Sequence, residues 1–222
     1  MAGTGEVWPH ILRRFPKLKT ITALDISHRM HKEAVGRLHD RYSDRITHIE
    51  ADALETDLPA NYSDLLISTF GLKTFNPDQQ AQLAQQIARI LKPGGSFALI
   101  EASDPKEWFL RPIYRFYLDT VLPLVERYFL RGANDFSMIG TYTRNFGDSA
   151  NIAKALKAAG LSVDMKKHFF GCATSVAGYK PLWIKPRKHW RMITGLLPPS
   201  RVPQHTAAMR GTRDVRRRPD VV

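Results

Sequence analysis

Two glycines near the start of the chain and an aspartate further along have the spacing of a nucleotide-binding turn. Gly3 and Gly5 flank Thr4. Glycine accepts a tight turn at such a bend and, lacking a Cβ, lets a ligand approach the backbone amides. Asp25 lies twenty residues beyond Gly5 at the end of an apolar run, where an acid can reach the ribose hydroxyls of a nucleotide-like cofactor. Because an isolated Gly-x-Gly is usually an ordinary turn, this interpretation depends on Asp25.

The elements that must position these residues alternate along the first half of the chain. Apolar runs predict strands over residues 20–25, 46–50, 64–68 and 97–101, and helical periodicity predicts helices over 8–15, 27–42 and 77–91. Pro77 suits a first helical turn, and the sequence Lys-Pro-Gly-Gly at 92–95 ends that helix. Strands alternating with helices of this length predict an α/β fold, with a parallel sheet and right-handed crossovers.

The second half is expected to cover this sheet and to close its edge. The aromatic-rich segment 108–130 predicts one or two helices over the carboxyl ends of the strands, and core packing beneath them accounts for most of its aromatic side chains. The sequence also predicts a helix over 151–159 that ends at Gly160. Strands over 162–168 and 173–180, separated by Gly171, predict an antiparallel hairpin at the sheet edge.

Composition divides the chain into two parts. The 222 residues carry a net charge of +12, but residues 186–222 hold nine Lys or Arg against two Asp, so that +7 lies in this segment and +5 in the rest. We therefore expect one domain over residues 1–185 and a basic tail over 186–222, whose Pro- and Arg-rich sequence is typical of disorder.

Other classes of protein find little support in the sequence. Cys172 is the single cysteine, which excludes an internal disulfide and fits a reducing cytoplasm. We expect it to be a small buried residue rather than a nucleophile. His28 and His31 are three residues apart on a predicted helix, where a solvated face is favoured over a metal site. No apolar run approaches the roughly 20 residues that cross a membrane.

Taken in order, the segments resemble the ubiquinone/menaquinone biosynthesis C-methyltransferases, a family of class I S-adenosylmethionine-dependent methyltransferases. Leu-Lys-Pro-Gly-Gly after a long helix is typical of that class, and Phe-Gly-Leu-Lys directly after a strand narrows the similarity to this family. The similarity covers about residues 2–181. The segments that carry it are residues 2–6, 24–27, 50–54, 68–72, 90–95 and the region of Leu122 and Pro123.

This resemblance implies that S-adenosyl-L-methionine binds across the opening turn. The amides near the two glycines would hold its methionyl end, Asp25 would accept from the ribose diol, and Asp52 and Ala53 would contact the adenine. The strand end at Ser68 would contact cofactor and substrate. The implied cofactor-binding residues are Gly3, Thr4, Gly5, Asp25, Ile26, Asp52, Ala53 and Ser68. Ordinary structural roles stay open for them, such as a helix N-terminal acid for Asp25.

The resemblance also implies methylation of a carbon in a polyprenyl quinol or a related hydroxylated aromatic. Lys73 occupies the position at which the family carries a catalytic arginine, and it keeps the charge but not the planar fork. A surface lysine is the alternative interpretation. The family's closing His-Arg-Gly motif is replaced by residues 175–179, Ser-Val-Ala-Gly-Tyr, which puts the acceptor in doubt.

Two further expectations concern the ends of the chain. Family members carry a buried strand before the glycine turn, so we expect this chain to lack that first strand and the strands ending at Asp25 and Ser68 to share no neighbour. The competing function is an inactive or degraded methyltransferase-like domain that acts as a binding protein. Its basic tail would then contact an anionic membrane surface at the membrane periphery or, less expected, nucleic acid.

Overall fold

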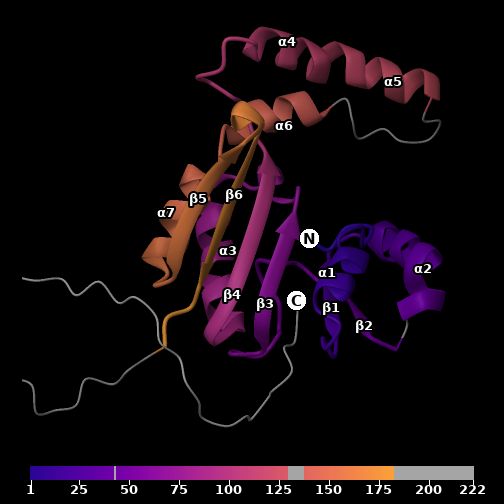
Figure 1. The fold of residues 1–222 in the computed structure, drawn as a ribbon, viewed down its shortest axis with the longest axis vertical. Helices are drawn as coiled ribbons and strands as arrows, with labels where there is room; N and C mark the ends of the chain where they lie inside the picture. Colours follow the sequence, from indigo (N-terminus) through magenta and orange to yellow (C-terminus); the bar gives the residue numbers. More distant parts are fainter. Residues whose placement is uncertain (43, 130–137, 183–222) are drawn as a thin grey trace, which may run out of the picture.

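The computed structural model describes residues 1–42, 44–129 and 138–182, and its strands form a sheet in two parts (Figure 1). The predicted tail over 186–222 lies outside the described residues. In the first part, β1 (Ile21–Asp25) runs parallel to β2 (Ile46–Glu50), with Asp25 opposite Glu50. These strands pack with α1 (Trp8–Arg14) and α2 (His28–Tyr42). All five residues of β1 are buried.

The second part of the sheet has the order β3-β4-β6-β5. Its strands are β3 (Ser63–Thr69), β4 (Leu91–Ala102), β5 (Ser162–His168) and β6 (Ala173–Tyr179). β3 and β4 are parallel, whereas β6 runs antiparallel to both β4 and β5. The helices α3 (Pro77–Ile90) and α7 (Ala150–Ala158) lie together over one face and bury the main hydrophobic core. The predicted α/β fold with an antiparallel hairpin at its edge is therefore confirmed.

Local sequence explains the start and end of α3. Asn76 accepts a hydrogen bond from the Gln79 amide at 2.9 Å, and the Gln79 side chain accepts one from the Asn76 amide at 3.0 Å. This capping box satisfies two amides that the first helical turn leaves free. The helix ends at Ile90 as expected, but β4 begins immediately at Leu91 instead of at residue 97. The strand starts early because Leu91 already pairs with Ser63 of β3, and Gly94 and Gly95 continue it by exchanging backbone hydrogen bonds of 2.8 Å with Lys180.

The two parts of the sheet meet at an interrupted seam. Among the described strands, β1 pairs with β2 and β3 pairs with β4, and no strand pairs with both β1 and β3. The expectation that the strands ending at Asp25 and Ser68 share no neighbour is thus confirmed for these residues. The start of the chain reaches the seam, where the Ala2 amide donates to the Leu24 carbonyl at 2.9 Å, and a 2.9 Å hydrogen bond between the Thr22 and Tyr62 hydroxyls crosses it. The seam leaves a groove between β1 and β3.

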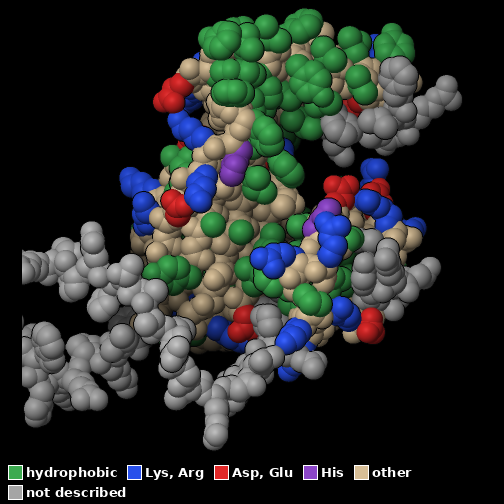
Figure 2. Space-filling view, in the orientation of Figure 1, with side chains coloured by type: hydrophobic (Ala, Val, Ile, Leu, Met, Phe, Trp, Pro, Cys, Tyr) green, Lys and Arg blue, Asp and Glu red, His purple; other side chains and the backbone are tan. Residues whose placement is uncertain are grey.

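Helices cover the carboxyl end of the second part of the sheet, as the sequence predicts. They are α4 (Arg111–Phe116), a π-helical turn (Tyr117–Val121), α5 (Leu122–Phe129) and α6 (Ile139–Phe146), and α6 has no counterpart in the sequence-based assignment. Apolar side chains gather on the outer surface of this layer (Figure 2). Phe109, Phe116 and Tyr128 are 83%, 59% and 69% exposed, so the expectation of core packing is wrong for them. No helix among the described residues is long and apolar enough to span a bilayer.

Candidate cofactor and acceptor site

The opening turn and Asp25 are in direct contact. The Gly3 amide donates to Asp25 Oδ2 at 2.8 Å, and the Ser27 amide donates to Oδ1 at 3.0 Å. The Met1 ammonium lies 2.9 Å from Oδ2 and also donates to the Leu24 carbonyl at 2.6 Å. The turn is therefore held against the carboxyl end of β1, which is where ligands bind in open α/β sheets.

The surroundings of Asp25 keep its carboxylate ionised. Burial raises the pKa of Asp25, but hydrogen bonds from the Met1 ammonium, Gly3 and Ser27 outweigh it and leave this pKa below its usual value. Burial lowers the pKa of the Met1 ammonium, and the charges of Asp25 and Asp52 partly oppose that shift. A carboxylate offers about four lone-pair sites. Three donors already surround Asp25, so a ligand that brings two hydroxyls must displace one of them.

The two glycines of the turn serve different purposes. Gly3 has φ +57°, and a Cβ built there would meet no atom within 4 Å, so its exposed side is open to a ligand. Gly5 has φ +73°, and a Cβ there would lie 2.5 Å from the Trp8 ring. Glycine is thus required at residue 5 for packing, whereas residue 3 leaves room for close approach. Between them, Thr4 accepts a hydrogen bond from Arg37 at 3.3 Å.

The loop after β2 lies beside Asp25. The Ala51 amide donates to the Asp25 carbonyl at 3.0 Å, which ties this loop to the end of β1. Asp52 accepts from the Leu54 amide at 2.9 Å and is close enough to Met1 to act on its pKa. Ala53 lines the groove between β1 and β3. Ile26 is 68% exposed beyond the end of β1.

Ser68 supplies an independent indication that a ligand fits this groove. It is only 5% exposed, and its Oγ atom has no hydrogen-bond partner among the described residues. A buried hydroxyl left without a partner costs about 1–3 kcal/mol, which a polar ligand group would offset. The groove is mostly apolar, with Thr22, Thr56, Thr69 and Gln86 as its other polar residues, and Met1, Ala2, Leu24 and Ala53 also line it. Asp25 and Asp52 do not line the groove themselves but are the chain neighbours of Leu24 and Ala53, which do, and this donor and acceptor set fits an adenosyl cofactor.

Lys73 is paired with a buried acid and is not a surface lysine. Its Nζ atom donates to Glu101 Oε1 at 3.1 Å and to the Phe70 carbonyl at 2.6 Å. The Lys73 side chain is 12% exposed and that of Glu101 is fully buried. Glu101 Oε2 also accepts from the Lys73 amide at 3.1 Å, and Oε1 accepts from the Ala102 amide at 2.8 Å. Sequence reasoning missed Glu101 as a functional candidate, although an acid at the end of an apolar strand was a usable signal.

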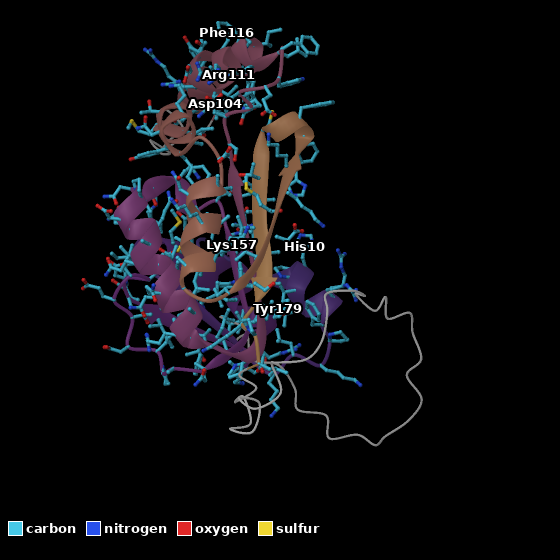
Figure 3. All side chains as sticks on the ribbon, turned by 90° about the vertical axis from the view of Figure 1, so that its left-hand side faces the viewer. His10, Asp104, Arg111, Phe116, Lys157 and Tyr179 are labelled. Atoms are coloured by element: carbon cyan, nitrogen blue, oxygen red, sulfur yellow. The ribbon has the colours of Figure 1, made fainter. Side chains whose placement is uncertain are left out.

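A second buried acid attaches the covering helices to β4. Asp104 is 5% exposed and forms ion pairs of 2.6 Å with Arg111 and Arg115 on α4. Hydrogen bonds from Arg111 and Arg115 outweigh the effect of burial and lower the pKa of Asp104 to about 2. Asp104 and Arg111 lie together at the end of the sheet (Figure 3). No sequence motif indicated this cluster.

Some of the remaining predictions about single residues are confirmed and others are wrong. His28 is exposed as expected, but His31 is only 7% exposed, so the solvated-face interpretation is wrong for His31. Its Nε2 atom lies near backbone carbonyls that a sequence pattern cannot reveal. Cys172 is half-buried, and burial raises the pKa of its thiol, which disfavours a nucleophile. Within the described ranges, no group of three His, Cys, Asp or Glu side chains could hold a metal ion.

Comparisons with known proteins show the family to which this chain belongs. The model of the ubiE/COQ5 methyltransferase family matches residues 1–180. A demethylmenaquinone methyltransferase from Lactiplantibacillus plantarum is 28% identical over 180 residues, which are 80% of this chain and 75% of the relative. A demethylmenaquinone methyltransferase from Geobacillus stearothermophilus is 29% identical over 161 residues, or 72% of this chain and 68% of the relative.

Solved structures share the fold at low sequence identity. Human N-acetylserotonin methyltransferase in complex with SAM aligns with a TM-score of 0.55 and 19% identity, covering 81% of this chain and 46% of that one. This chain thus spans about half the length of the human protein. The PH0226 protein from Pyrococcus horikoshii aligns with a TM-score of 0.56 and 16% identity, covering 81% and 80% of the two chains.

Proposed function

Because the chain belongs to the ubiE/COQ5 methyltransferase family and is an S-adenosylmethionine-dependent methyltransferase, we propose that it methylates a ring carbon of a polyprenylated quinol. The curated relatives named above are demethylmenaquinone methyltransferases, so reduced demethylmenaquinone is the acceptor we favour. The single observation that carries the cofactor assignment is the contact between the Asp25 carboxylate and the Gly3 amide.

The chain's own residues would hold the donor at the carboxyl ends of β1 and β2. Asp25 would accept hydrogen bonds from the ribose hydroxyls, and the Met1 ammonium would give way to one of them. Asp52 and Ala53 would contact the adenine, and the unpartnered Ser68 hydroxyl would bond a polar group deeper in the groove. S-adenosylmethionine supplies an electrophilic methyl group on a sulfonium centre, so the protein mainly orients two partners and excludes water.

Lys73 would act on the acceptor. Carbon methylation of a quinol requires a ring hydroxyl to pass its proton to water, so that electron density reaches the attacking carbon, which loses its own hydrogen to water after it has taken the methyl group. The Lys73 ammonium would stabilise the resulting phenolate, as a preorganised charge does for other developing oxyanions. Glu101 would hold this ammonium in place, since its buried carboxylate contacts both Nζ and the backbone amide of Lys73.

The proposal is tested by methyl incorporation from labelled S-adenosylmethionine. With a short-chain demethylmenaquinol as acceptor, the full chain should yield labelled menaquinol. Asp25→Ala should abolish this product, and Asp78→Ala, a change at an exposed acid in the first turn of α3, should not. Incorporation that survives Asp25→Ala would contradict the cofactor assignment. If only other hydroxylated aromatics become labelled, the quinol is not the acceptor, but the assignment of S-adenosylmethionine as methyl donor still holds.

The alternative of an inactive binding domain gains no support. Its main feature, the basic segment 186–222, lies outside the described residues, and the matched family is one of methyltransferases. Peripheral contact with a membrane stays a prediction. Binding of the full chain to anionic vesicles, compared with a chain ending at residue 185, would measure it.

A further inference from the structure

His31 occupies a central position behind the candidate cofactor site. It lies in the first turn of α2 and is only 7% exposed. Its Nε2 atom is 3.0 Å from the carbonyl of Asp25, the last residue of β1, and 3.1 Å from the carbonyl of Ile49, the last residue but one of β2. The ring therefore bridges the carboxyl ends of the two strands that position Asp25 and Asp52, the acids assigned to the cofactor.

The partners of His31 define where its proton lies. Both neighbours of Nε2 are carbonyl oxygens, which only accept, so Nε2 carries the hydrogen and shares it between them. Nδ1 lies 3.1 Å from Nδ1 of His48, so in the neutral pair it accepts a hydrogen bond from His48. The His31 ring is thus held at both nitrogens and cannot turn without breaking one of these contacts.

The contacts continue from His48 to the opening turn. The rings of His31 and His48 meet edge-on with centroids 5.3 Å apart, and the His48 ring meets the Trp8 ring in the same way at 5.5 Å. Trp8 in turn fills the space beside Gly5, where no Cβ would fit. A continuous row of rings therefore joins the end of β1, which carries Asp25, to the turn that carries Gly3.

We propose that His31 is a positioning residue for the cofactor site. It contacts the backbone of Asp25 directly and the glycine turn through His48 and Trp8, and it thereby keeps the Asp25 carboxylate at hydrogen-bonding distance from that turn. The proposal rests on the cofactor role assigned to Asp25. His31 contacts the backbone of Asp25 and not its carboxylate, so it acts on a ligand only through that residue. A histidine that merely fills the core would stabilise the whole domain without a selective effect on this contact.

Hydrogen exchange separates these two roles without any ligand. In the full chain, we expect His31→Leu to speed exchange of the Gly3 and Ser27 amides, which both bond Asp25, by about 10-fold, while the Ile87 amide in α3 changes by less than twofold. His31→Gln should stay close to the wild type because its amide group offers two N–H donors for the two carbonyls. His10→Leu, a change at an exposed histidine of α1, is the matched control.

Equilibrium binding of S-adenosylhomocysteine provides the second measurement. His31→Leu should weaken binding about 10-fold, and His31→Gln less than threefold. Combined with Asp25→Ala, His31→Leu should add no further loss, because both changes remove the same contact. If the wild-type chain does not bind the ligand, the cofactor role of Asp25 fails, and the exchange ratios alone decide the role of His31.

Three results would overturn the inference. Exchange could accelerate equally at Gly3, Ser27 and Ile87, which would indicate general destabilisation. Gly3 and Ser27 could exchange at the wild-type rate in His31→Leu. Finally, the losses of affinity from Asp25→Ala and His31→Leu could be additive, which would mean that His31 does not act through Asp25.

Discussion

Substitutions at Lys73 can distinguish the contribution of its charge to stability from the contribution of that charge to catalysis. Lys73→Met keeps most of the side-chain volume but removes the ammonium that faces the buried Glu101 carboxylate at 3.1 Å. Breaking a buried pair by removing one partner costs about 3–5 kcal/mol. Glu101 would retain two amide donors, at 3.1 and 2.8 Å, so we expect the lower end, about 3 kcal/mol. Against a typical domain stability of about 5–15 kcal/mol, the variant should still fold.

The double variant Lys73→Met, Glu101→Gln restores stability without restoring the charge. The glutamine oxygen can keep a backbone amide bond of Glu101, and no unpaired charge stays buried, so most of the lost stability should return. If the Lys73 ammonium stabilises the phenolate of the acceptor, kcat should remain about 100- to 1,000-fold below the wild type in both variants. Lys73→Arg keeps the charge and should retain the larger part of the activity.

The measurements are urea unfolding for stability and steady-state methyl transfer at saturating donor and acceptor for kcat. The catalytic argument requires stability and rate to separate in the double variant. A double variant that recovers its methyl-transfer rate together with its stability would refute it, because Lys73 would then matter only as a partner of Glu101. If Lys73→Met does not fold, the stability and rate of the double variant can still be compared with those of the wild type.

The other predictions concern residues outside this pair. Gly5→Ala should cost about 2–4 kcal/mol of unfolding free energy, because its Cβ would clash with Trp8 at a positive φ. Gly3→Ala should cost only about 1–2 kcal/mol but should weaken cofactor binding. Denaturant titration would measure the unfolding free energies, and calorimetry would measure the binding. The pKa of Asp104 falls from 3.8 to about 2 on folding, so this carboxylate contributes about 2 kcal/mol to the free energy of unfolding. The contribution is complete above about pH 4 and is lost as the pH falls to about 2. Asp104→Asn should remove this pH-dependent loss of stability from acid-unfolding curves. Asn76→Ala should cost about 1 kcal/mol of stability with no change in kcat, since it removes only the cap of α3.

The sequence predicts best what depends on local pattern and on the direction of parallel strands. The start of α3 follows from Pro77, and the edge hairpin follows from two short strands around Gly171. The contact between Gly3 and Asp25 was also within reach, because the carboxyl ends of parallel strands gather at one edge of a sheet. These predictions need no knowledge of which side chains face one another.

Pairings between distant side chains were out of reach for a physical reason. Glu101 meets Lys73 only because β3 and β4 are neighbours in parallel register, and His31 is buried only because α2 presents that face to β1 and β2. The covering helices show the same limit. Arg111 and Arg115 turn inward to Asp104, and Phe116 is left exposed, which is the reverse of the usual helix on a core.

The arrangement divides the proposed reaction between the two parts of the sheet. Of the residues assigned to the donor, Asp25 ends β1 and Asp52 follows β2, whereas Lys73 follows β3 and is held by Glu101 on β4. Methyl transfer needs donor and acceptor aligned to within a fraction of an ångström. Since no described strand spans the seam, that alignment depends on the packing of the groove, where Met1 bonds the Leu24 carbonyl and its side chain lies near Gly71. A change that widened this groove should therefore reduce kcat more than it reduces the affinity for either substrate.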